Sequence, residues 1–199
     1  MNWGDIQIES LKKMFLNTEN ITVDNLETYK SDKKYKTYLF AMPQACNEAI
    51  NYIVSALGTD TKEFQITRED VNATYDLSNT TDLDDFRKIK KVVCPSGVSW
   101  KMKTPTLLEI NGWYDGNVYI YYEPTVTIVD SDTEKTATTG LREEYARIIP
   151  LYIAGELYKD DDLSMSTMYM NEFFNMINIF AQNIVYIDNP KIDTIYSIG

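Results

Sequence analysis

The segment between residues 141 and 183 constrains the fold of this chain more than any other. Two stretches with apolar residues at intervals of three and four flank an acidic triplet, Asp160-Asp161-Asp162. That spacing places the apolar side chains on one face of a helix. The triplet supplies an N-cap and negative charge for the start of the second helix. The segment therefore predicts an antiparallel helix pair joined by a tight acidic corner.

Each helix of the predicted pair has one apolar stripe. The first helix runs from about residue 141 to Lys159, and its stripe consists of Leu141, Tyr145, Ile148, Ile149, Tyr152, Ile153 and Leu157. The stripe of the second helix consists of Met165, Met168, Tyr169, Phe173, Met176, Ile177 and Phe180. We expect both stripes to be buried against the rest of the fold.

Two more helices are predicted nearer the N-terminus, at residues 5–16 and 42–57. Pro43 suits the first turn of the second of these helices, and Gly58 is placed to end it. The polar residues 17–37 between them predict a loop. The expected buried faces are Ile6, Leu11, Met14 and Phe15 in the first helix, and Ala45, Ala49, Ile50, Ile53, Ala56 and Leu57 in the second.

Residues 59–130 have a different pattern, in which β-branched and aromatic residues alternate. Asp115-Gly116 favours a tight hairpin turn, because glycine readily adopts a positive φ angle. The pattern predicts a small antiparallel sandwich or barrel. Its expected strands are residues 63–66, 71–75, 89–93, 98–102, 106–110, 118–122 and 125–129.

These elements together predict an α+β fold with four parts. Residues 1–58 and 141–183 form a helical part, residues 59–130 form an inserted β-domain, and residues 184–199 form a C-terminal extended arm. Isoleucine recurs every three residues in the arm. The arm is either a strand that returns to the β-domain or a segment that leaves its own subunit and docks on a neighbouring subunit or on the portal of a larger assembly. For docking, the candidate interface residues are Ile187, Ile192, Ile195, Tyr196 and Ile198.

The residue types argue against an enzyme. The chain of 199 residues has no histidine, which excludes histidine-based triads and the usual proton shuttle. Its two cysteines, Cys46 and Cys94, are too far apart for a metal motif and are expected to be buried free thiols. Consecutive aspartates such as the triplet at 160–162 point in different directions, so they favour a helix cap over a cation site. We expect no catalytic residue, no metal and no cofactor.

Charge and hydropathy exclude other classes. The net charge is −11, with no basic stripe to neutralise phosphates, so tight nucleic-acid binding is not expected. No segment approaches the roughly 20 apolar residues that span a bilayer. The first fifteen residues lack the apolar core of a signal peptide. The protein is expected to be made in a reducing cytoplasm.

Three segments together resemble a known protein family. They are the start, Trp3-Gly4-Asp5-Ile6-Gln7 to Lys13-Met14-Phe15; the middle, Asp76-Leu77 to Phe86-Arg87; and the end, from Ile149-Pro150-Leu151 through the acidic triplet to Asn171-Glu172-Phe173-Phe174. Their order and spacing are similar to those of the head-to-tail connector (adaptor) proteins of tailed bacteriophages, which form the ring beneath the portal.

The resemblance implies a structural protein of the virion, located at the head-tail junction and made in the host cytoplasm. It implies self-assembly into a ring, with twelve subunits expected, between the portal protein and a tail or further connector protein. Double-stranded DNA would pass through the lumen during ejection without specific binding, and an acidic surface would help by repelling it.

Two other functions stay open. The β-domain could bind carbohydrate or a surface receptor through exposed aromatic residues, for which the candidates are Trp100, Trp113, Tyr119 and Tyr121. The same residues are also typical of the core of a small β-domain. A carboxylate enzyme would use Asp162 or Glu172. A second acidic cluster at Asp82, Asp84 and Asp85 identifies no acid with the raised pKa that such chemistry needs.

Overall fold

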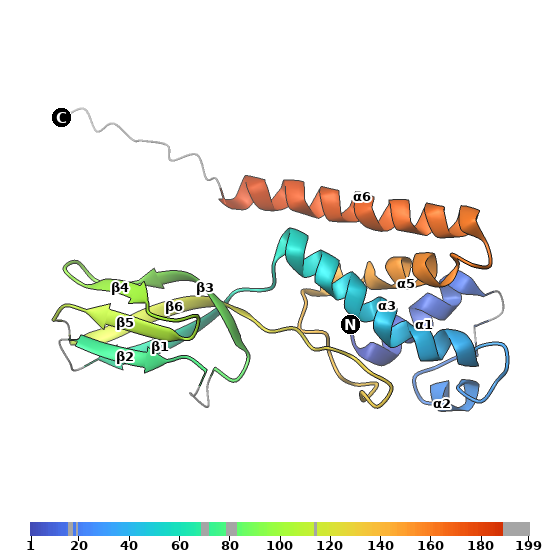
Figure 1. Cartoon of the computed structure of the whole chain (residues 1–199), viewed down its shortest axis with the longest axis horizontal. Helices are drawn as coiled ribbons and strands as arrows, with labels where there is room; N and C mark the ends of the chain where they lie inside the picture. Colours follow the sequence, from blue (N-terminus) through green and yellow to red (C-terminus); the bar gives the residue numbers. More distant parts are fainter. Residues whose placement is uncertain (16–17, 19, 69–71, 79–82, 114, 189–199) are drawn as a thin grey trace. The chain divides into compact units, whose positions relative to one another are not determined.

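The computed structural model describes residues 1–15, 18, 20–68, 72–78, 83–113 and 115–188, without the side chains of 68 and 184–188. Helices and two small antiparallel sheets confirm the predicted α+β class (Figure 1). The chain divides into two compact units. The helical unit comprises Met1–Leu57, Ile128–Thr139 and the chain from Glu143 onward, and the β unit comprises Gly58–Thr127 with Gly140–Arg142.

The helical unit is organised around one short central helix. The elements in order are α1 (Trp3–Met14), α2 (Leu26–Tyr29), α3 (Lys36–Leu57), α4 (Glu143–Ala146), α5 (Ile149–Leu157) and α6 (Leu163–Asp188). Helices α1, α3 and α6 all pack against α5 (Figure 1). Every residue of α5 from Ile149 to Gly155 is consequently buried, as expected for a helix that is apolar on all sides.

The predicted helix pair is present, but its boundaries differ. The first helix is broken into α4 and α5, because Pro150 has no N–H to continue a helix and lies in the first turn of α5. It ends at Leu157 rather than Lys159. The second helix, α6, extends to Asp188. Residues 184–188 are therefore helical, and the prediction that they belong to an extended arm was wrong.

The apolar stripes are largely confirmed. On the first helix Tyr145, Ile148, Ile149, Tyr152 and Ile153 are buried, and Leu141 and Leu157 are half-buried. On α6 the buried stripe is centred on Phe173 and Ile177. Met168 is 47% exposed, because its position on the helix faces away from this stripe. The sequence prediction missed Ser166, which is buried and donates a hydrogen bond from Oγ to the Gly155 carbonyl at 2.7 Å.

Helix α3 begins at Lys36, six residues before its predicted start, so Pro43 lies inside the helix and not in its first turn. Burial of Leu39 within this additional turn and a half, and of Met42 just after it, stabilises the longer helix and offsets the backbone hydrogen bond lost at Pro43. Ala56 is exposed, contrary to expectation, and the other predicted residues of the buried face are buried. Gly58, at φ +74°, ends the helix as predicted.

The start of the chain also differs in detail. Helix α1 spans Trp3–Met14 rather than residues 5–16, and Phe15 follows it as a half-buried cap residue. The segment predicted to be a loop, residues 17–37, contains α2. That helix forms around Leu26, which is fully buried.

The β unit is a sandwich of two three-stranded antiparallel sheets, with strand orders β1-β6-β3 and β2-β5-β4. Leu108 and Ile110 of one sheet and Val118 and Ile120 of the other are fully buried in one shared core. The strands are β1 (Lys62–Arg68), β2 (Asn72–Asp76), β3 (Phe86–Val93), β4 (Ser99–Met102), β5 (Leu107–Asn111) and β6 (Gly116–Pro124).

Two strand predictions were wrong. Residues 125–129 form no strand, because Pro124 has no N–H for the ladder and β6 ends there. Asp115-Gly116 does not form a hairpin turn. Strands β5 and β6 belong to different sheets, so the connection that contains Asp115 crosses from one sheet to the other. Gly116 has φ +140°, as the prediction of a positive angle required.

No helix in the described part of the chain is both long enough and apolar enough to cross a membrane.

Candidate functional site

The five residues that the sequence singled out for an interface are not placed by the structure. Ile187 lies in the last turn of α6, without a described side chain. Ile192, Ile195, Tyr196 and Ile198 lie outside the described residues. Docking of this segment remains a prediction.

The structure instead shows an unusual surface on the long helix that precedes it. The side of α6 that faces away from α5 exposes four large apolar residues: Leu163, Met168, Phe174 and Ile179 are 71%, 47%, 41% and 43% exposed. Most residues between them on this side are polar and uncharged, namely Thr167, Asn171, Asn175, Asn178 and Gln182, and Glu172 is exposed beside Met168 and Ile179. We call the four apolar and five uncharged polar residues the outer α6 face.

The outer α6 face lacks the charges of an ordinary surface helix. Glu172 is the only charged residue between Leu163 and Ile187. With a quarter of all residues charged, about six charges would be expected in 25 residues of average composition. Loss of charge with retention of aromatic residues and methionine is typical of the centre of a protein–protein interface. The outer α6 face is the candidate assembly surface.

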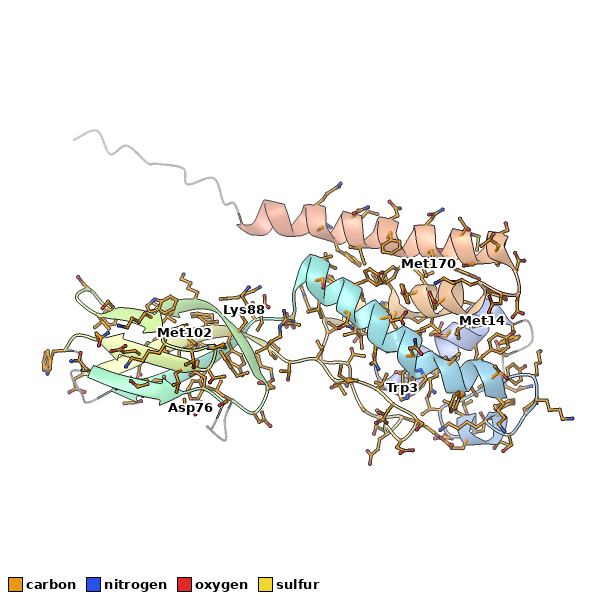
Figure 2. The ribbon with its side chains drawn as sticks, viewed as in Figure 1. Trp3, Met14, Asp76, Lys88, Met102 and Met170 are labelled. Atoms are coloured by element: carbon orange, nitrogen blue, oxygen red, sulfur yellow. The ribbon has the colours of Figure 1, made fainter. Side chains whose placement is uncertain are left out.

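The inner side of α6 is held firmly against α1 and α5. A Cβ on Gly155 would lie 2.9 Å from Cγ of Met170, which Figure 2 labels on α6, so only glycine permits this close crossing. The Tyr169 hydroxyl donates to the Lys13 carbonyl at 2.8 Å, and the Tyr158 hydroxyl donates to the Met14 carbonyl. The helical unit therefore presents the outer α6 face from a fixed helix.

The acidic triplet caps this helix. Asp162 accepts hydrogen bonds from the backbone N–H groups of Ser164 and Met165, both at 3.0 Å, which confirms the predicted N-cap. Asp161 accepts a hydrogen bond from the Tyr38 hydroxyl at 2.5 Å, and this bond raises the pKa of Tyr38 to about 12. Asp160 is exposed. The described residues include no group of three His, Cys, Asp or Glu side chains positioned to hold a metal ion.

The second acidic cluster is also structural where it is described. Asp85 pairs with Lys62 and accepts a hydrogen bond from the Tyr122 hydroxyl at 3.0 Å. Burial raises the pKa of Asp85, but these hydrogen bonds outweigh it and the pKa is lowered overall. Burial together with Asp85 raises the pKa of Tyr122 to about 12. Asp84 is exposed, and Asp82 lies outside the described residues.

The aromatic and thiol candidates divide between core and surface. Trp100 is 41% and Trp113 is 75% exposed, so the interpretation of these tryptophans as core residues was wrong. Tyr119 and Tyr121 are half-buried, on the opposite side of β6 from Val118. Both cysteines are free, as expected; Cys46 is buried, which raises its pKa to about 12, whereas Cys94 is half-buried.

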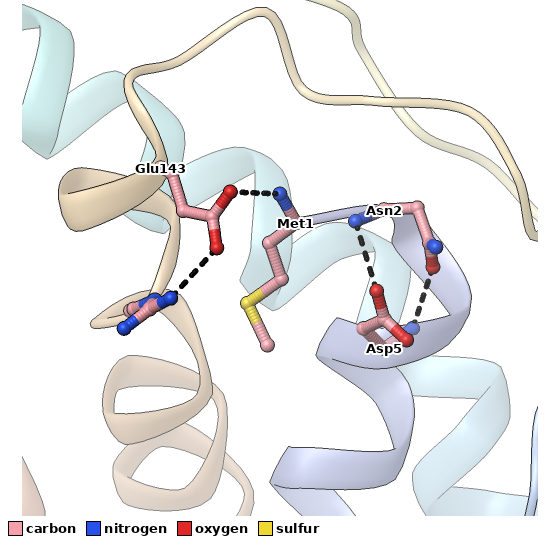
Figure 3. Close-up of polar contacts among 5 residues, drawn as sticks. Met1, Asn2, Asp5 and Glu143 are labelled. Atoms are coloured by element: carbon pink, nitrogen blue, oxygen red, sulfur yellow. Dashed lines mark hydrogen bonds and ion pairs between the residues drawn. The ribbon is translucent and has the colours of Figure 1, made fainter.

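The N-terminus is fixed by a small polar network (Figure 3). Asn2 and Asp5 form a reciprocal capping box on α1, with N···O distances of 2.8 and 3.3 Å. The amino group of Met1 lies 3.8 Å from the Glu143 carboxylate, which also accepts a 2.8 Å hydrogen bond from Arg147. The spacing of Asn2 and Asp5 is a signal of a helix start that the sequence analysis did not use.

A pocket beside the start of α3, here called the Trp3 pocket, was not predicted from the sequence. Its lining includes Trp3, Gln7, Lys36, Phe40 and Pro43, together with the segment at Asp130 and Ser131. Phe40 is 82% exposed. The sequence signal that could have indicated this pocket is Phe40, an aromatic residue that does not belong to the apolar stripe of its helix.

Comparison of the chain with known protein families gives no match, and comparison with curated proteins gives none either.

Proposed function

We propose that this protein is a subunit of a head-to-tail connector (adaptor) ring of a tailed bacteriophage, which joins the portal to the tail and lines the DNA ejection path. The observation that carries the proposal is the outer α6 face, a long helical surface with apolar residues and almost no charge. The resemblance of the three sequence segments also supports it, and the α+β fold agrees with the fold that the sequence patterns predict.

The outer α6 face suits a ring because each subunit in a ring presents one surface to a different surface of the next. Met168, Phe174 and Ile179 are roughly half exposed, and Leu163 is 71% exposed. Burying the rest of such side chains yields about 1 kcal/mol each, or about 4 kcal/mol per contact. Association costs at least as much in lost freedom. A single contact is therefore weak, and assembly depends on ring closure or on the portal as a template.

The charge of the chain fits passage of DNA. A net charge of −11 repels the phosphate backbone and keeps adhesion to it weak. The proposed ring has twelve subunits, with the portal protein on one side and a tail or further connector protein on the other. Double-stranded DNA passes through the lumen of the ring without specific binding.

The test is native mass spectrometry and electron cryo-microscopy of the purified protein with its cognate portal. The wild type is expected to add a closed ring to the portal. Phe174→Asp and Ile179→Asp should abolish the ring without unfolding the protein, since both side chains are already partly in water. Ile128→Asp is the matched control, because Ile128 is 66% exposed in the same unit but outside α6. A wild type that stays monomeric beside its portal would overturn the proposal.

A second candidate is a binding module for carbohydrate or a receptor, and the observation that favours it is the 75% exposure of Trp113. An exposed indole is a common stacking surface for sugar rings. A glycan array distinguishes the two: binding that disappears in Trp113→Ala supports the module, and no binding across a broad array removes it.

A further inference from the structure

The Trp3 pocket has the chemistry of a peptide site. It lies between α1, α3 and the segment at Asp130 and Ser131, and its walls are mainly apolar. Trp3 is buried and lines the pocket. Phe40, at the rim, has the highest exposure of any large apolar side chain in the described residues. An aromatic ring is held in water there, beside an apolar depression that could receive an aliphatic side chain.

Two polar groups at the pocket are available to a ligand. Gln7 is only 3% exposed and lines the pocket, and its carboxamide makes no hydrogen bond to any described residue. Pro43 has no N–H, so it cannot donate to the carbonyl of Leu39 four residues earlier in α3. The backbone of a bound peptide offers both donors and acceptors for such groups.

The rim is charged with both signs. Lys36 is exposed and has no ion-pair partner among the described residues. Lys30 pairs with Glu27 at 2.9 Å, and Asp130 stands among the lining residues. A suitable ligand therefore carries apolar residues for the depression, with one acidic and one basic residue nearby.

We propose that the Trp3 pocket binds the segment of residues 189–199 from a second copy of this chain. That segment has the sequence NPKIDTIYSIG, with isoleucine at 192, 195 and 198. Asp193 complements Lys36, and Lys191 complements Asp130. This inference deepens the proposed function and rests on it in one respect: a ring brings copies of the chain side by side.

The length of the chain argues for a second copy. Tyr38, next to the pocket residues Leu39 and Phe40, contacts Asp161 at the start of α6. Helix α6 has 26 residues and is therefore about 39 Å long. The segment thus leaves the helix on the order of 30–40 Å from the pocket of its own subunit. Ile192 and Ile195 can lie at most about 14 and 25 Å beyond Asp188. They cannot enter their own pocket.

Disulfide trapping tests this directly, with Cys94→Ser in every protein and Cys46 left in place because it is buried. Full-length Phe40→Cys is mixed with full-length Ile195→Cys, which carries a different tag. Mild oxidation is expected to link the two chains at least tenfold more than Ile128→Cys mixed with Ile195→Cys. Equal linking of both mixtures, or no linking of either, would overturn the proposal. A disulfide within one chain of the double variant Phe40→Cys/Ile195→Cys, oxidised at low protein concentration, would also overturn the proposal, because it would show that the segment binds its own subunit.

A labelled peptide of residues 189–199 gives the second measurement, by fluorescence anisotropy with the full-length protein. Phe40→Ser should weaken binding at least tenfold, whereas Ile128→Ser should leave it unchanged. A peptide that binds neither wild type nor variants contradicts the inference. Failure of this inference differs from failure of the proposed function: rings that form on the portal with Phe40→Ser as with the wild type refute the pocket alone.

Discussion

The two sides of α6 can be separated by two adjacent substitutions, Phe173→Ala and Phe174→Ala. Phe173 is fully buried and its ring contacts those of Tyr152 and Phe174 at centroid distances of 5.1 and 5.3 Å. Phe174 is 41% exposed and contacts Tyr52 at 5.6 Å. We expect Phe173→Ala to destabilise the helical unit, and Phe174→Ala chiefly to weaken self-association.

The structure gives the magnitudes. Truncating a fully buried phenylalanine costs about 3–5 kcal/mol in transfer, cavity and lost ring contacts. Since a domain has only about 5–15 kcal/mol of stability, Phe173→Ala should lower the free energy of unfolding by a third or more. Phe174 loses only the buried part of its surface, which is about 1 kcal/mol.

The assay can follow the helical unit alone. Of the three tryptophans, Trp3 lies in the helical unit, whereas Trp100 and Trp113 lie in the β unit. In a Trp100→Phe, Trp113→Phe background, urea unfolding followed by fluorescence reports Trp3. Sedimentation velocity on the same proteins reports self-association. Equal loss of stability in both alanine variants would refute the assignment of an inner and an outer side, and unchanged association of Phe174→Ala would refute the outer α6 face as an interface.

Three further predictions concern the packing and capping of α6. Gly155→Val places Cβ within 2.9 Å of Met170 Cγ and 3.2 Å of its backbone nitrogen. The forced separation of α5 and α6 should lower the free energy of unfolding, measured in urea, by about 1–3 kcal/mol. A decrease of less than a few tenths of a kcal/mol would contradict the close crossing. Asp162→Ala removes the N-cap and should cost about 1 kcal/mol; Asp160→Ala is the control, and an equal loss in both would argue against capping. Hydrogen bonding to Asp161 raises the pKa of Tyr38 to about 12, so the folded state keeps this proton longer than the unfolded chain does. That contribution to stability is fully present below about pH 10 and is lost as the pH rises to about 12; Tyr38→Phe should flatten the fall in the free energy of unfolding over this window, and an unchanged slope would contradict the assignment.

Local patterns predicted most of the elements but not their partners. The i, i+3/i+4 spacing found α6 and the burial of Phe173, and alternation found the burial of Val118, Ile120 and Tyr122. Asp115-Gly116 suggested a hairpin because this dipeptide indicates only that the chain turns. Whether the two flanking strands pair with each other depends on how all the strands pack around the core. Pro43 suggested a helix start for the same reason: burial of Leu39 and Met42, which outweighs the proline, is a tertiary effect.

The candidate site was less accessible to sequence reasoning. Position on the helix decides that Phe174 faces outward and Phe173 inward, and this requires knowing which side α5 occupies. The lack of charge along α6 is visible in the sequence, but it is as typical of a buried helix as of an interface. Only the exposure of Leu163 and Ile179 separates the two interpretations.

The division of the chain into units has a consequence for biosynthesis. The β unit is nearly continuous, from Gly58 to Thr127, so it can complete its core soon after that stretch leaves the ribosome. The helical unit cannot, because α1 and α3 pack on α5, which is made about ninety residues after the end of α3. During that interval the faces of α1 and α3 that pack on α5 have no partner. The nascent protein therefore passes through a stage with a folded sandwich and uncovered helices, and this is the stage at which a chaperone would be needed.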